Sequence, residues 1–215
     1  MSAGRVIRSL ERTRPRWSPT ALRVVADETQ DPFRVLIACI LSLRTQDTTT
    51  GPAAARLFAA ACTPAAMLGL SPQRIARTIY PVGFYRTKAR VIRAICRALL
   101  DRFHGRVPDD IEVLLSLPGV GRKTANLVVT MAYGKPGICV DTHVHRISNR
   151  LGWVRTRTPA ETEMALRARL PGRYWIGLND LLVSFGQNVC VPLSPRCSIC
   201  PVRALCRRVG VRRSR

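Results

Sequence analysis

Four cysteines near the C-terminus constrain this chain more than any other feature. Cys190, Cys197, Cys200 and Cys206 are separated by six, two and five residues. Thiols this close together cannot all form disulfide bonds without strain, whereas a compact loop can wrap them around one metal centre. The spacing therefore predicts a metal-binding segment with free thiols, which is typical of a reducing, intracellular and here cytoplasmic compartment.

Two metal centres compete for this ligand set. A structural zinc site usually pairs two C-x2-C knuckles across a longer gap, and only Cys197 and Cys200 form such a knuckle. The observed spacing favours a 4Fe-4S cluster over zinc. The other cysteines lie in largely apolar stretches and are interpreted as small core residues: Cys39, Cys62, Cys96 and Cys139.

The net charge of +22, from 35 basic and 13 acidic residues, indicates a polyanionic partner. An arginine-rich proteome or adaptation to heat would raise the total, but arginines also gather at both ends of the chain. We expect nucleic acid rather than a membrane surface, because no basic helix with an aromatic face is visible. The longest apolar run, Val35 to Leu41, is too short to span a bilayer. No N-terminal segment resembles an export signal, and we expect a monomer.

Capping residues followed by proline predict the starts of several helices. The pairs are Ser18-Pro19, Asp31-Pro32, Thr63-Pro64, Ser71-Pro72 and Thr158-Pro159. Residues 33–43 are apolar nearly all round, which predicts a central buried helix. Apolar residues recur at helical spacing from Ile92 to Phe103, which predicts an amphipathic surface helix. No strand alternation of useful length is present, so the predicted fold is all-α with two helical lobes.

A glycine-containing turn lies between two predicted helices, 111–117 and 123–131. Gly119 and Gly121 permit a tight turn with positive φ and bring backbone N–H groups to the start of the next helix, where they can bind a phosphate. This pattern is a helix-hairpin-helix. By itself it indicates only a clamp for the DNA backbone, which occurs in proteins of many activities.

Lys123 directly follows this turn, and it is one of only three lysines among 35 basic residues. Arginine binds phosphate at least as well but does not lose its proton, whereas a lysine can act as a nucleophile. A phosphate-binding lysine is the alternative. Asp141 begins the next predicted helix, either as a simple N-cap or with its second oxygen facing a pocket. His143 and His145 lie on different sides of that helix, so contacts with solvent, DNA or core are favoured over metal binding.

Three motifs together resemble the endonuclease III family of DNA glycosylases. They are LPGVGRKTAN at 117–126, VDTHVHRISNRL at 140–151, and the cysteine pattern. The resemblance runs from about Asp31 to Cys206. It implies a six-helix barrel at 30–136, a second helical domain from 1–29 and 137–215 that holds a 4Fe-4S cluster, and an active cleft between them.

The resemblance also implies roles for individual residues. Lys123 would be the nucleophile and Asp141 the assisting carboxylate. Gln46, or Arg44 at the position of the family's glutamine, would fill the space left by a flipped nucleotide, and Phe84 stands where the family usually has a leucine wedge. Further expected DNA contacts are Leu117, Gly119, Val120, Gly121, Arg122, His143 and Arg196, the last being the one basic residue in the loop 191–196.

The predicted function is a glycosylase with AP lyase activity that acts on oxidised pyrimidines and abasic sites in duplex DNA. A mismatch-specific adenine glycosylase is expected to have a glutamate near Cys39 and a small residue in place of Lys123. A thymine-mismatch glycosylase is expected to have tyrosine there. A noncatalytic helix-hairpin-helix module is the remaining alternative, and the presence of both Lys123 and Asp141 disfavours it.

Overall fold

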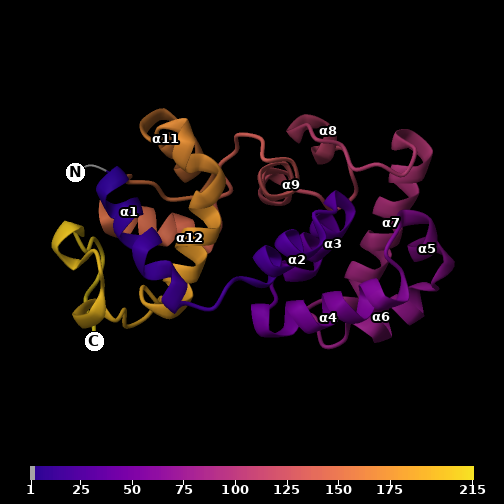
Figure 1. Ribbon diagram of the computed structural model, residues 1–215, viewed down its shortest axis with the longest axis horizontal. Helices are drawn as coiled ribbons and strands as arrows, with labels where there is room; N and C mark the ends of the chain where they lie inside the picture. The colour runs from indigo at the N-terminus through magenta and orange to yellow at the C-terminus, as the bar shows by residue number, and fades with distance from the viewer. Residues whose placement is uncertain (1–2) are drawn as a thin grey trace. The chain divides into compact units, whose positions relative to one another are not determined.

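The computed structural model describes residues 3–215, and every regular element in this range is a helix (Figure 1). The prediction of an all-α fold is confirmed. The chain divides into two compact units, one made of Ala21–Lys135 and the other of the N-terminal residues through Thr20 with Pro136–Arg215. Residues 1 and 2 of the expected segment 1–29 lie outside the described range. None of the helices in residues 3–215 is both long and apolar enough to cross a membrane.

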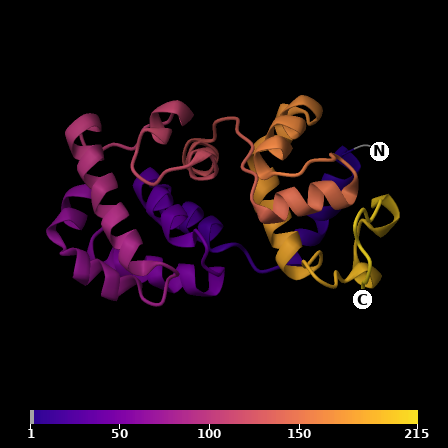
Figure 2. The same cartoon turned by 180° about the vertical axis from the view of Figure 1, so that it is seen from behind.

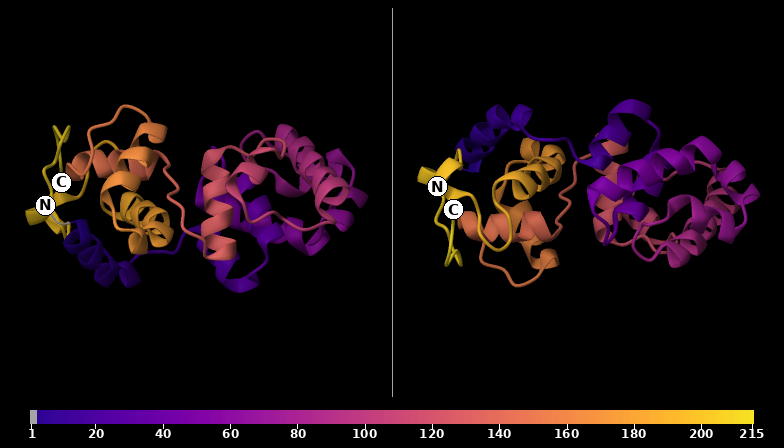
Figure 3. Two further views of the ribbon diagram at one scale, coloured as in Figure 1. Left: turned by 90° about the horizontal axis from the view of Figure 1, so that it is seen from above. Right: turned by 90° about the horizontal axis from the view of Figure 1, so that it is seen from below.

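The first unit contains eight α-helices around a single apolar core. They are α2 (Ala21–Thr29), α3 (Pro32–Ser42), α4 (Asp47–Ala60), α5 (Pro64–Gly69), α6 (Pro72–Ile79), α7 (Tyr85–Phe103), α8 (Ile111–Leu115) and α9 (Arg122–Tyr133). As predicted, α3 is buried along nearly its whole length, and it packs against α2, α4, α7 and α9 (Figure 3). The predicted amphipathic helix is α7, which turns Ile92, Ile95 and Leu99 into the core.

The second unit joins segments from both ends of the chain. It contains α1 (Ala3–Thr13), η1 (Arg14–Arg16), α10 (Thr142–Leu151), α11 (Pro159–Arg169), η2 (Gly172–Tyr174), α12 (Trp175–Asn188), η3 (Cys197–Ile199) and η4 (Arg203–Leu205). Helix α1 lies beside the C-terminal segment (Figure 2), and Ser9 Oγ donates a hydrogen bond to the carbonyl oxygen of Pro201 at 3.1 Å. Val6, Ile7 and Leu10 of α1 are buried with residues of α10 and α12.

The boundary between the units lies before α2, whereas the sequence placed it at residue 30. Helix α2 groups with the hairpin-containing unit because it packs against α3 and α4. The chain leaves this unit between Lys135 and Pro136.

Four of the five predicted proline-linked caps are present. The side chains of Asp31, Thr63, Ser71 and Thr158 each accept a hydrogen bond from a backbone N–H in the first turn of the following helix. The Ser18-Pro19 prediction is wrong, because α2 begins only at Ala21. Its first amide is satisfied from elsewhere, since Ala21 N–H donates to Asp47 Oδ2 at 3.4 Å.

Candidate DNA-binding and catalytic site

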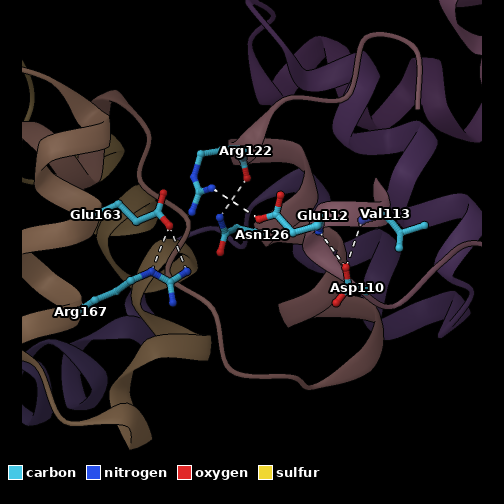
Figure 4. A network of polar contacts seen from close by, with 7 residues as sticks. All are labelled: Asp110, Glu112, Val113, Arg122, Asn126, Glu163 and Arg167. Carbon is cyan, nitrogen blue, oxygen red and sulfur yellow. Dashed lines mark hydrogen bonds and ion pairs between the residues drawn. The ribbon is translucent and has the colours of Figure 1, made fainter. Parts of the chain in front are cut away.

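The predicted helix-hairpin-helix is formed by α8, a tight turn and α9. Asp110 Oδ1 caps α8 by accepting hydrogen bonds from the amides of Glu112 at 2.9 Å and Val113 at 3.0 Å (Figure 4). The turn needs glycine at position 119, where φ is +72°. Gly121 has φ of −100°, so the prediction of positive φ was wrong there. A Cβ added at position 121 would meet nothing within 4 Å, so the space beside this glycine at the start of α9 is open.

The residues of the hairpin that are expected to contact DNA differ in the exposure of their side chains. Leu117 is 2% exposed and Val120 7% exposed, because both side chains pack in the core of their unit. Neither side chain is presented to a ligand, and the backbone N–H groups of Leu117 and Val120 already donate to the carbonyl oxygens of Leu114 and Leu117. Arg122 is exposed, lies 4.0 Å from Glu112 Oε1, and its carbonyl oxygen accepts a hydrogen bond from Asn126 Nδ2 at 3.0 Å (Figure 4).

Lys123 is the second residue of α9 and is half-buried against α3. Its charge acts on the Cys39 thiol of that helix. Burial raises the pKa of Cys39 to about 12, and the positive charge of Lys123 opposes this shift. The lysine amine therefore lies within electrostatic range of a thiol that stays neutral, at the end of the helix where backbone N–H groups attract anions.

Asp141 is the N-cap of α10, as its position in the sequence predicted. Its Oδ1 accepts hydrogen bonds from the amides of His143 and Val144, both at 2.9 Å. The two histidines diverge: His143 Nδ1 lies 3.1 Å from Arg146 Nη2, and His145 Nδ1 lies 2.7 Å from Thr162 Oγ1. Their Nδ1 atoms thus contact different side chains, one within α10 and the other on α11.

Arg44 and Phe84 come together although forty positions separate them in the chain. The Arg44 guanidinium carbon lies 4.9 Å from the centre of the Phe84 ring, which is cation–π geometry. Phe84 is 59% exposed, so a large apolar ring is presented at the surface. Both residues adopt left-handed backbone, with φ of +54° and +58°. Gln46 is also exposed, but its backbone carbonyl accepts the first hydrogen bonds of α4.

The four C-terminal cysteines surround one cavity, which is lined by all of their thiols and by apolar residues such as Ile147, Phe185 and Val202. Burial, together with the three neighbouring thiols, raises the pKa of Cys200 to about 11. Within residues 3–215, no three side chains of the usual ligand types converge at the spacing expected for a single ion.

Arginines and backbone groups supply hydrogen bonds around these sulfurs. Arg150 Nη1 donates to Cys190 Sγ at 3.4 Å, and the backbone N–H of Arg208 donates to Cys206 Sγ at 3.3 Å. Arg196, the expected contact in the preceding loop, is exposed. The arginine-rich tail is held against the cavity, since Val209 N–H donates to the Arg150 carbonyl at 3.1 Å. Of the other cysteines, Cys39, Cys96 and Cys139 are buried as predicted, while Cys62 is half-buried.

Lys88 has no role that its sequence pattern predicted, yet it is one of the most constrained polar groups in the molecule. Its side chain is only 6% exposed, and its ammonium group is surrounded by oxygen acceptors. Two sequence signals could have found it. Lys88 is one of three lysines in an arginine-rich chain, and it lies four residues before Ile92, in register with the buried face of α7.

A helix-hairpin-helix followed by a lysine, in an all-helical chain with a cysteine-lined cavity, defines a class of helical DNA-backbone-binding proteins. The family model described as "HhH-GPD superfamily base excision DNA repair protein" matches residues 37–171. Endonuclease III of Thermotoga maritima is 49% identical over 176 residues, which cover 82% of this chain and 83% of that protein.

Two solved structures agree with this match. A non-covalent Endonuclease III–DNA complex superposes with a TM-score of 0.85 at 35% identity, covering 97% of this chain and 96% of that one. A trapped Endonuclease III–DNA covalent intermediate, an estranged-adenine complex, gives a TM-score of 0.78 at 40% identity and covers 83% and 84%. The chain belongs to the HhH-GPD superfamily of base excision DNA repair proteins and, within it, to the endonuclease III family.

Proposed function

We propose that this protein is a bifunctional DNA glycosylase and AP lyase that removes oxidised or ring-saturated pyrimidines from duplex DNA. The observation that carries this proposal is the position of Lys123, an amine at the first turn of α9 directly after the hairpin that is suited to hold the DNA backbone. Two further findings support it: the chain's similarity to Endonuclease III, and the trapped covalent intermediate that Endonuclease III forms with DNA.

In the proposed mechanism, the neutral amine of Lys123 attacks C1′ of the damaged nucleotide and the base departs. The sugar ring then opens at its C1′–O4′ bond to give a Schiff base. In the following β-elimination the C2′ proton is lost and the 3′-phosphate departs, which cuts the strand on the 3′ side of the lesion. Asp141 assists by accepting the proton from the amine and by stabilising positive charge that develops on the sugar. Its Oδ1 is held by two backbone amides of α10, which fixes the orientation of the carboxylate.

Selection of damaged bases begins with the cost of extrusion. Ring-saturated pyrimidines stack poorly, so less free energy is needed to flip them out of the duplex. The Arg44–Phe84 pair is suited to the space they leave, because an exposed ring can wedge between base steps while a guanidinium donates hydrogen bonds to the base that remains. This geometry favours Arg44 over Gln46 as the residue that fills the gap.

The cofactor proposed for the cysteine cavity is a 4Fe-4S cluster. The residues fit such a group: four soft sulfur donors line one cavity together with apolar side chains and arginines, and N–H groups donate to two of the sulfurs. Cys190, Cys197, Cys200 and Cys206 would hold the cluster. When bound, it would cross-link the C-terminal segment to the rest of its unit, and no step of the base-removal chemistry is assigned to it.

Borohydride trapping on a panel of single-lesion duplexes tests this function. The panel contains dihydrothymine, an abasic site, a G·T mismatch, an adenine opposite 8-oxoguanine, and undamaged DNA. We expect covalent adducts with dihydrothymine and with the abasic site, and none with the mismatches. Base removal confined to a mismatch, detected by alkaline cleavage of the resulting abasic site, would favour a mismatch glycosylase. DNA binding with neither base removal nor an adduct would favour the noncatalytic module.

A further inference from the structure

The Lys88 ammonium joins two loops that are distant in sequence. Its Nζ donates hydrogen bonds to the carbonyl oxygens of Leu41 at 2.7 Å and Leu43 at 2.5 Å, and to Thr45 Oγ1 at 3.0 Å. These acceptors lie at the end of α3 and in the connection to α4. Lys88 itself lies in the first turn of α7, directly after the loop that contains Phe84. A single buried cation therefore ties the loop 43–46 to the segment that follows the loop 81–84.

Thr45 extends this link to the backbone of the second loop. Its Oγ1 also accepts a hydrogen bond from Gly83 N–H at 3.1 Å. The two loops are in direct contact here, because a Cβ added to Gly83 would lie 2.7 Å from the carbonyl oxygen of Arg44. Arg44 and Phe84 are the residues adjacent to these contacts, and each has a left-handed backbone that neighbouring structure must hold in place.

The chemistry of the site requires lysine in its charged form. Three converging acceptors need three donors, which an ammonium group supplies and a neutral amine does not, while a guanidinium is a planar fork. Burial lowers the pKa of Lys88 to about 8, so keeping it protonated at neutral pH costs folding free energy. A buried charge held against this cost, in a chain that otherwise favours arginine, points to a role in geometry rather than in stability.

We propose that Lys88 is a positioning residue for base extrusion: it binds the loops 43–46 and 81–84 together and thereby presets the Arg44–Phe84 pair in the conformation that enters DNA. This inference rests on the proposed function of that pair. Lys88 touches neither the substrate nor the reacting atoms in this account. It acts through backbone carbonyls and through the hydroxyl of Thr45.

The test compares Lys88→Met, which keeps an unbranched side chain one atom shorter but removes its donors, with Lys88→Arg and with the control Lys135→Met. Lys135 is an exposed lysine of the same unit, paired with Asp109 at 2.8 Å. In single-turnover cleavage of a dihydrothymine duplex, we expect Lys88→Met to be at least tenfold slower, Lys88→Arg to recover little of this loss, and the control to match the parent.

A double-mutant cycle distinguishes positioning from general stability. In a background of Arg44→Ala with Phe84→Ala, the Lys88→Met change should cost less than twofold in cleavage rate, because the pair it positions is gone. Equal losses in both backgrounds would overturn the proposal. If the pair itself proved dispensable in a protein that still gives trapped adducts, this inference would fail while the glycosylase assignment stood.

Amide hydrogen exchange provides a readout that does not depend on activity. Lys88→Met should raise exchange at Thr45 and Gly83 at least tenfold and leave the hairpin amides at the start of α9 unchanged. Unchanged exchange in both loops would contradict the clamp whether or not the protein is a glycosylase. Should Lys88→Met fail to fold, Thr45→Val removes the shared hydroxyl while leaving the lysine in place, and the same exchange pattern is expected.

Discussion

Replacing Gly119 by alanine should destabilise the hairpin-containing unit by an amount that the structure allows us to estimate. The residue has φ of +72°, where an L-amino acid loses about 1–2 kcal/mol relative to glycine. The added Cβ would also lie 2.7 Å from Val91 Cγ1 of α7, and overpacking of this kind costs about 1–3 kcal/mol. The sum predicts a loss of roughly 2–5 kcal/mol in the free energy of unfolding.

Denaturant unfolding followed by circular dichroism measures this loss, and a second substitution separates its two parts. Adding Val91→Ala removes the steric contact but leaves the backbone strain. The double variant should therefore recover about 1–3 kcal/mol relative to the sum of the single changes. Gly119→Ala with the stability of the parent, or a strictly additive double variant, would refute this account of the turn.

Gly121→Ala is the matched control for the same turn. Its φ of −100° is accessible to alanine and its Cβ would meet nothing within 4 Å, so stability should change by less than about 0.5 kcal/mol. If the backbone at the start of α9 approaches a DNA phosphate, the added methyl group should still weaken duplex binding. Substitution of Gly119 thus reports on the stability of the turn, and substitution of Gly121 reports on its binding to DNA.

Three further predictions follow from the cysteine cavity, the tail and Lys88. Protein isolated without added metal should contain about four iron and four sulfide per chain, and Cys200→Ser should lose both and loosen the C-terminal segment. Zinc in fresh protein would contradict the cluster. Changing Arg212 and Arg213 to Gln should lower the slope of log affinity against log salt by about 0.9 for each DNA phosphate that is no longer neutralised. The control variant, Arg97→Gln with Arg106→Gln, should leave this slope unchanged. An unchanged slope in the tail variant would mean that Arg212 and Arg213 are solvated charges that do not contact DNA. The pKa of Lys88 is lowered from 10.5 to about 8 in the folded state, so between these pH values the unfolded state binds more protons at this residue than the folded state does. The free energy of unfolding of the parent, relative to that of Lys88→Met, should therefore rise with pH across this range. A flat or falling difference would contradict the lowered pKa of Lys88.

Local chemistry explains which parts of the fold the sequence predicted. Asp31 and Thr63 cap helices through their own neighbouring amides, and the apolar run of α3 has no polar face to expose. The start of α2 was predicted wrongly because the N–H of its first residue, Ala21, donates to Asp47, which lies beyond the next helix. A pattern of two adjacent residues does not predict a contact with a residue so distant in sequence.

The candidate site divides in the same way. Lys123, Asp141 and the four C-terminal cysteines can be proposed from the sequence because each stands in a short motif with a recognisable spacing. The Arg44–Phe84 contact depends on how the loops after α3 and before α7 fold against each other, which the sequence pattern did not show. Lys88 was overlooked because a lysine on an amphipathic helix is usually solvated, although its register with Ile92 placed it on the buried face.

The central claim, that Lys123 is the attacking amine, is tested most directly by borohydride trapping of Lys123→Arg on a duplex with a single abasic site. Arginine keeps the positive charge and the capacity to bind a phosphate, but it does not become a neutral nucleophile at working pH. We predict that Lys123→Arg binds this duplex, gives no trapped adduct and does not cut the strand. Asp141→Asn should retain a trace of adduct formation and of strand cleavage. A trapped adduct from Lys123→Arg would contradict the assignment and place the nucleophile elsewhere.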